Sequence, residues 1–227
     1  MRRVEIIVPM LGDDIRYAIE IAETMEAANR IVPIGLEGRE IKGASTYATI
    51  QNSLALKLAL DVARIFDVSD NNIGLDRQDK ASIPVLLHHL RKPEISAELI
   101  RRSRLWAPLP SYISLPAEDT CKAAVELALK RADELETTKA ANALKRVRQF
   151  RTCRLAHMLF GKEIDAYPLY DDLFMLLRIA KSISTAAFLA VEGEITIFAE
   201  NKRRSRDQGE WFWRRVLDGL LITETAS

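Results

Sequence analysis

The sequence predicts an all-α fold, and three observations support this prediction. Glycine is scarce: the chain has 9 glycines in 227 residues, about 4% against an average near 7%. Straight-chain helix formers such as Ala, Leu, Glu, Lys and Arg are abundant. Apolar residues recur at intervals of three and four, the period of an amphipathic helix, through most of the chain. With 48% hydrophobic and 29% charged residues, the composition is that of a globular rather than a disordered protein.

Prolines and glycines divide the first half of the chain into helical segments. The first helix is expected over 13–32, where Pro33 ends it. The second is expected over 44–66, and its apolar positions cover most of its circumference, which predicts a central place in a bundle. Two shorter helices are expected over 81–90 and 94–106.

Three helices are expected in the second half. The longest helical stretch begins after Pro116 and runs to about Met158, with acidic residues at its start and basic residues at its end, as the helix macrodipole favours. Another helix is expected over 168–193. Segment 194–199 is ambiguous between strand and helix, and a terminal helix over 205–221 carries two tryptophans.

The composition and the cysteine count restrict the class of protein. The 33 basic and 32 acidic residues give a net charge of +1, so composition alone does not indicate a polyanion-binding protein. Two cysteines are too few for a disulfide framework and fit a reducing cytosol. The sequence has no run of 18 apolar residues. We therefore expect a cytoplasmic protein that does not bind a membrane.

Motifs of the large enzyme classes are missing from the sequence. The chain has three histidines and no pair of Cys or His residues at zinc-ligand spacing that is matched by a second pair, so we expect no metal site. It has neither a glycine-rich phosphate loop nor the Gly-x-Ser-x-Gly turn of a serine hydrolase, and we expect no cofactor. The neighbouring His88 and His89 point about 100° apart on a helix, so we interpret them as surface or interhelix residues.

The segment from Lys139 to His157 is unusual because it holds six basic residues and no acidic residue. On a helix, Arg151 lies on or beside an apolar stripe, where an unpaired charge is costly, so it needs a partner or an anion. His157 lies about 9 Å further along the axis and about 120° around it. A structural explanation is also open, because basic residues at a helix end are favoured by the helix dipole and arginine often extends from the edge of a stripe. The apolar stripe consists of Leu144, Val147, Leu155 and Met158.

The run Phe150-Arg-Thr-Cys-Arg-Leu-Ala-His157, followed by an acidic, proline-containing linker and Leu169-Tyr-Asp-Asp-Leu-Phe-Met-Leu, resembles the HEPN superfamily of helical ribonucleases and nucleotide-binding proteins. The resemblance is strongest to the abortive-infection U branch of phage-defence proteins. The signature of the superfamily is an arginine, four to six residues and a histidine near a helix end, and Arg151-x5-His157 fits it. Segments 51–67 and 79–86 also resemble this branch.

The resemblance, which covers about 12–192, implies a fold and an activity. The fold is a HEPN-type helical bundle with long antiparallel helices, in a single domain over 1–227 with a C-terminal helical extension over 193–227. The activity is metal-independent RNA cleavage, in phage defence or as a toxin. The implied catalytic residues are Arg151, which stabilises charge on the phosphorane, and His157, which exchanges a proton. The implied RNA-binding residues are Arg148, Thr152 and Arg154.

The resemblance also implies partners, and it leaves an alternative function open. In this superfamily two protomers commonly bring their motifs together, so we expect a homodimer, and an antitoxin is a possible partner. The family usually has Asn, Asp or a similar polar residue directly after the arginine, where this chain has Thr152. The alternative is a non-catalytic helical dimer that binds a nucleotide, RNA or a partner protein. Basic and aromatic residues over 101–106 and 202–213 fit either RNA contacts or solvated charge.

Overall fold

The computed structural model describes residues 1–35, 44–68, 74–108, 110, 113–155, 167–195 and 198–222. Helices account for 84% of the described residues, which contain no strand, and this confirms the all-α prediction. The α-helices are α1 (Arg2–Gly35), α2 (Ala44–Ile65), α3 (Ile83–Leu90), α4 (Pro93–Ser103), α5 (Ala117–Ala132), α6 (Thr138–Phe150), α7 (Tyr170–Glu192) and α8 (Phe198–Ile222). Three single turns are the 3-10 turns η1 (Leu75–Arg77) and η2 (Asp133–Glu136) and the π-helical turn η3 (Arg151–Leu155).

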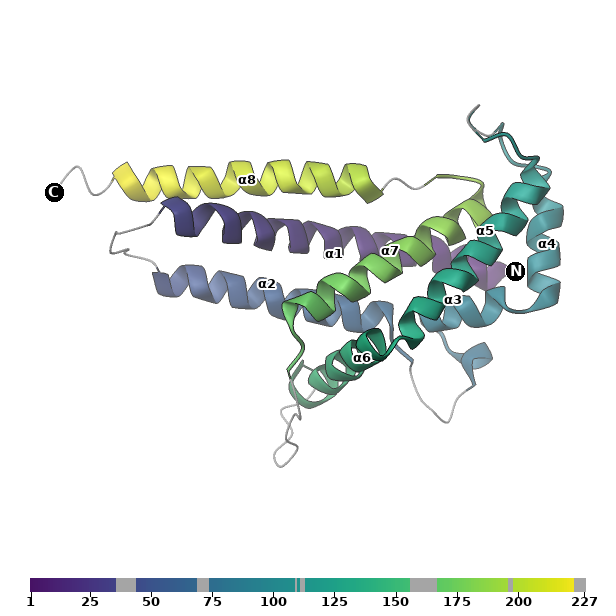
Figure 1. The fold of residues 1–227 in the computed structure, drawn as a ribbon, viewed down its shortest axis with the longest axis horizontal. Helices are drawn as coiled ribbons and strands as arrows, with labels where there is room; N and C mark the ends of the chain where they lie inside the picture. Colours follow the sequence, from purple (N-terminus) through teal and green to yellow (C-terminus); the bar gives the residue numbers. More distant parts are fainter. Residues whose placement is uncertain are drawn as a thin grey trace.

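The long helices form a layer that two further helices cross. Helices α1, α2 and α8 lie lengthwise beside one another, with α1 in the middle and α2 antiparallel to it (Figure 1). Helix α7 crosses this layer diagonally, and α5 runs antiparallel beside α7. Helices α3 and α4 lie at the end of the molecule that holds the N-terminus. The short α6 packs against α7 and α2.

Helix α7 lies at the centre of the hydrophobic core. By length and composition it is the one described helix that would pass for a membrane span, and 56% of its apolar window is buried in the bundle. The helix ends at Gly193, where φ is +70°, a conformation that favours glycine. A Cβ on Gly193 would lie 2.5 Å from the Trp106 ring, so close packing also requires glycine there.

The start of the first helix was predicted wrongly. Helix α1 begins at Arg2, before the expected start at Asp13, and it contains Pro9. Val4, Val8 and Leu11 are fully or almost fully buried in the main core. Burial of these side chains outweighs the backbone hydrogen bond that proline removes. The hydrophobic core thus includes residues before residue 12, where the expected helical core over 12–192 begins.

The long helix expected up to Met158 is interrupted, which corrects the prediction for this segment. After α5 the chain forms the turn η2, and a new helix, α6, begins directly after Thr137. The Thr137 hydroxyl donates to the Glu134 carbonyl over 2.8 Å and accepts the Ala140 amide over 3.4 Å. A threonine that bonds the local backbone in this way caps a new helix rather than continuing the old one.

Helix α8 of the C-terminal extension packs beside the C-terminal part of α1 (Figure 1). The helix begins at Phe198, earlier than the expected start at Ser205. Trp213 is buried, and its indole nitrogen donates to the Thr24 carbonyl of α1 over 3.0 Å. A Cβ on Gly209 would lie 3.2 Å from the Thr24 Cα, so glycine permits close approach of α8 to α1.

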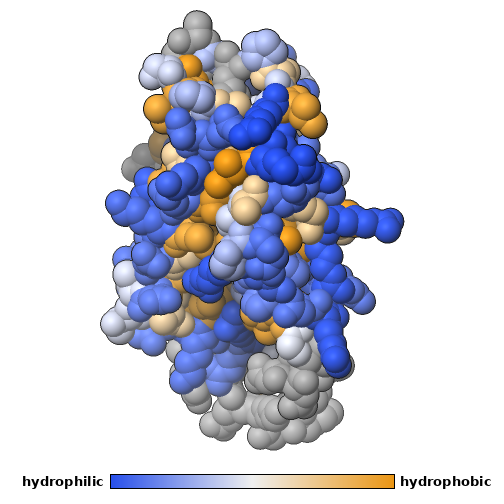
Figure 2. Space-filling model, turned by 90° about the vertical axis from the view of Figure 1, so that its right-hand side faces the viewer, coloured by the Kyte–Doolittle hydropathy of each residue, from blue (hydrophilic) through white to orange (hydrophobic). Residues whose placement is uncertain are grey.

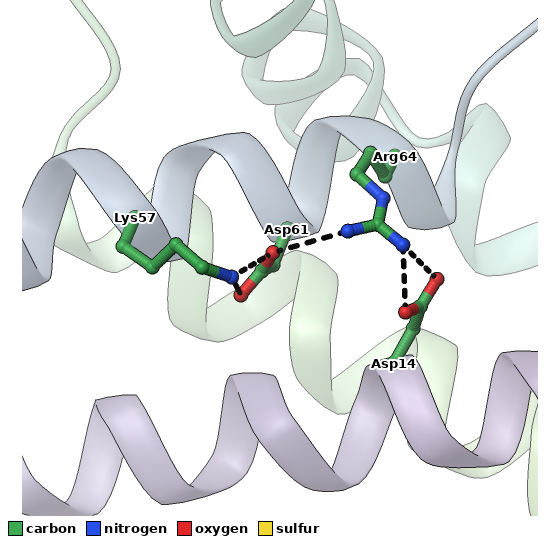
Figure 3. Close-up of polar contacts among 4 residues, drawn as sticks. All are labelled: Asp14, Lys57, Asp61 and Arg64. Carbon is green, nitrogen blue, oxygen red and sulfur yellow. Dashed lines mark hydrogen bonds and ion pairs between the residues drawn. The ribbon is translucent and has the colours of Figure 1, made fainter.

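Four charged residues join α1 to α2 (Figure 3). The Arg64 guanidinium of α2 donates to both carboxylate oxygens of Asp14 on α1, over 2.9 and 3.1 Å. Lys57 donates to the buried Asp61 one turn further along α2. These contacts fix the last turns of α2, and α2 leads directly into the site described next.

Candidate nucleic-acid interface

Arginines at the end of α6 anchor that helix to the end of α2. Arg148 donates to the Phe66 carbonyl over 3.0 Å. Arg151, the first residue of η3, forms an ion pair with Asp67, with 2.6 Å between Nη1 and Oδ1. The Arg151 side chain is 32% exposed. The expectation that Arg151 has a partner instead of standing free in solvent is confirmed.

Asp67 links two cations that are distant in the sequence. Its side chain is 11% exposed and accepts hydrogen bonds from Arg151 and from Lys80. Burial raises the pKa of Asp67, but the hydrogen bonds from Lys80 and Arg151 outweigh burial and leave the pKa below its ordinary value. Asp67 is therefore a carboxylate at neutral pH and holds Arg151 in place. Sequence reasoning did not assign it a role, because nothing in a single sequence pairs residues 84 positions apart.

A shallow groove of about 620 Å³, called the α6 groove below, lies along α6 and η3. Two of the predicted RNA-binding residues, Arg148 and Thr152, line this groove, and Thr152 is exposed. The exposed Lys145 adds a second cation. None of the described residues that line the groove is acidic, and Leu135, Ala141 and Leu144 form its apolar part. A groove with cations, a hydroxyl and apolar surface is suited to a nucleic-acid backbone with its bases.

Burial of the Arg148 guanidinium changes its pKa, even though the residue as a whole is exposed. Desolvation of its guanidinium lowers the pKa of Arg148, and the nearby Asp67 carboxylate opposes this effect. An arginine keeps its charge under such a shift. Arg148 therefore presents a positive charge at the wall of the groove.

Of the remaining predicted site residues, Arg151 is described completely, and Arg154 and His157 are not. Arg151 contacts Asp67 and is not among the residues that line the α6 groove. The side chain of Arg154 and the whole of His157 lie outside the described residues. Of the apolar stripe that includes Leu144 and Val147, Val147 is buried in the chain's own core.

Among the described residues, the histidines and cysteines form no second site. His89 is buried, and burial lowers its pKa, while the Nε2 atom of His88 lies 3.2 Å from Asp76; both are interhelix residues, as expected. Burial raises the pKa of Cys121 to about 11, so its thiol stays protonated. Over the described residues, no group of three or more His, Cys, Asp or Glu side chains could hold a metal ion.

Hydrophobic side chains also reach the surface, as Figure 2 shows for the face that carries the N-terminal end of the molecule. A groove of about 420 Å³ between α5 and α7 is lined mostly by apolar residues, among them Leu115, Leu127 and Leu189. Of its described lining residues, Arg131 alone is charged. Because a polyanion needs several cations, the α6 groove fits RNA better than this one does.

Comparisons with known proteins add no assignment to this geometry. No family model, curated protein or solved structure matches the chain.

Proposed function

We propose that the protein binds RNA in the α6 groove and cleaves it without a metal ion. The observation that carries the proposal is the lining of this groove: it includes Lys145, Arg148 and Thr152, and none of its described lining residues is acidic. Phosphate contacts by Lys and Arg supply most of the affinity of such interfaces. The cleavage step is supported by the resemblance of the Arg151-x5-His157 run to the HEPN signature.

In this proposal the ribose 2′-hydroxyl attacks the adjacent phosphorus. His157 takes part in the proton transfer, because its intrinsic pKa lies near neutral pH. Arg151, held by Asp67, stabilises the negative charge that builds on the phosphorane oxygens. The P–O5′ bond breaks, the leaving oxygen is protonated, and the products are a 2′,3′-cyclic phosphate and a 5′-hydroxyl.

A second candidate is RNA binding without cleavage, and the Arg151–Asp67 ion pair favours it. The charge of Arg151 is already balanced by a carboxylate 2.6 Å away, so structural anchoring alone accounts for its position. Thr152, where the family usually has Asn or Asp, points in the same direction. The two candidates share the RNA-binding groove and differ in whether a cut product forms.

Incubation of the pure protein with a labelled single-stranded RNA in EDTA separates these candidates. We expect cleavage products ending in a cyclic phosphate, and no loss of activity in EDTA. Lys145→Ala should weaken RNA binding and reduce the slope of log affinity against log salt by about one, the change expected for one lost phosphate contact. The control is Lys122→Ala, an exposed lysine on α5. Cleavage that requires added divalent metal would contradict the catalytic proposal, and equal binding by both variants would contradict the groove assignment.

We also propose that two copies associate near the end of α6, as the family resemblance implies. An isologous interface would bring both Arg151–His157 runs to one cleft. Light scattering at micromolar concentration should give about twice the chain mass of 25.6 kDa. A mass near that of one chain, in the presence and absence of RNA, would contradict the dimer.

A further inference from the structure

Helices α1, α7 and α8 border a cavity of about 340 Å³ that differs from the α6 groove in place and in lining. The volume lies within the range of small-ligand sites. Five basic and two acidic residues line it, together with apolar side chains that include Ile19, Phe174 and Leu177. The cavity thus combines an excess of positive charge with an apolar wall.

Acidic partners account for four of the five cations. Glu23 of α1, whose side chain is 9% exposed, accepts a hydrogen bond from Arg206 over 3.0 Å and pairs with Lys202 over 3.3 Å. The two other arginines bind acids outside the lining: Arg30 pairs with Glu210, and Arg178 pairs with Glu134. Glu23 is therefore the carboxylate shared by the two cations of α8.

Lys181 of α7 is the fifth cation, and within the described part of the chain it has no hydrogen bond or ion pair. The residue is partly buried. Burial and the neighbouring Lys202 lower the pKa of Lys181, while Glu23 opposes them. A partly desolvated ammonium without a direct ion pair is unfavourable, and an anion in the cavity would relieve this cost.

We propose that this cavity binds a small organic phosphate. Lys181, Lys202 and Arg206 carry three positive charges against the two carboxylates of Glu23 and Glu26, and a phosphate group would offset the excess positive charge. Phe174 and the apolar wall provide a surface for the organic part of the ligand. The volume admits one small molecule rather than a polymer. This proposal concerns a second site and does not depend on RNA binding at α6.

Isothermal titration of the whole chain with phenyl phosphate and with inorganic phosphate tests the proposal. Phenyl phosphate should bind once per chain and more tightly than inorganic phosphate, because only the former contacts the apolar wall. Lys181→Met should weaken binding of phenyl phosphate by about tenfold or more, the loss expected for one charge-assisted hydrogen bond. Lys181→Arg should retain binding. Lys122→Met, on the exposed surface of α5, is the matched control and should bind like the wild type.

Thermal melting detects binding of phenyl phosphate without a measurement of its affinity. Phenyl phosphate should raise the Tm of the wild type, as any ligand of the native state does. Lys181→Met should melt no lower than the wild type without ligand, since it removes an unpaired cation, and its Tm should no longer respond to phenyl phosphate. Absence of binding to the wild type, equal affinity for both phosphates, or unchanged binding by Lys181→Met would overturn the proposal. Binding of single-stranded RNA should be the same in Lys181→Met and wild type, so failure of one proposal leaves the other testable.

Discussion

Replacement of His157 by alanine should lower the rate of RNA cleavage by about 10²-fold or more, the usual contribution of a proton-transfer residue. The residue titrates near neutral pH in its unperturbed state, and alanine can neither take nor give the proton. Initial rates on a labelled RNA in EDTA measure the effect. His88→Ala is the matched control, because His88 faces Asp76 on a different part of the chain. A His157→Ala variant that cleaves at the wild-type rate would contradict the assignment of the catalytic histidine.

Arg151→Ala should lower cleavage by a similar factor, since it removes the group that stabilises charge on the phosphorane. The substitution also removes one of the partners of Asp67, so a loss of fold must be separated from a loss of chemistry. Arg151→Lys keeps a cation opposite Asp67 but loses the bidentate fork; it should fold normally and still cleave poorly. If Arg151→Lys retains full activity, the role of Arg151 is structural.

Asp172→Asn should destabilise the protein by about 2–4 kcal/mol, because Asp172 is a buried carboxylate whose charged partner would remain. Arg146 of α6 donates to both of its oxygens, over 2.8 and 2.6 Å, and the Leu169 amide donates over 2.9 Å. The Asp172 side chain is 4% exposed and that of Arg146 is 26% exposed, so solvent screens the pair only in part. Urea denaturation measures the free energy of unfolding.

The matched control is Asp171→Asn, an exposed neighbour in the same first turn of α7, which should change stability by less than about 0.5 kcal/mol. The pH dependence gives a second check. Burial raises the pKa of Asp172, but hydrogen bonds from Arg146 and the Leu169 amide outweigh it and leave the pKa below the ordinary value of 3.8. Its stabilisation is therefore present above that value and is lost as pH falls through the folded-state pKa. Equal stability of Asp172→Asn and Asp171→Asn at neutral pH would contradict the assigned role of the Arg146–Asp172 pair.

Local sequence patterns predicted the fold class and several helix boundaries. The apolar spacing over 44–66 matches α2, and the range 168–193 contains α7, whose end at Gly193 follows from the left-handed conformation that glycine permits. Such features depend on residues three or four positions apart, and the sequence contains them directly. Local rules failed at Pro9, where α1 continues because Val4 and Val8 are buried by distant segments. Burial of this kind depends on the tertiary structure.

At the candidate site, too, some features followed from the local sequence and others only from the tertiary structure. The density of basic residues over 139–157 was visible in the sequence, and so was the need of Arg151 for a partner beside an apolar stripe. Only the tertiary structure decided which cations are neutralised: Asp67 pairs with Arg151, while the described residues that line the groove beside Arg148 include no acid. The physical reason is that charges separate or pair according to distance in space. A carboxylate 84 positions away along the chain lies 2.6 Å away in the fold.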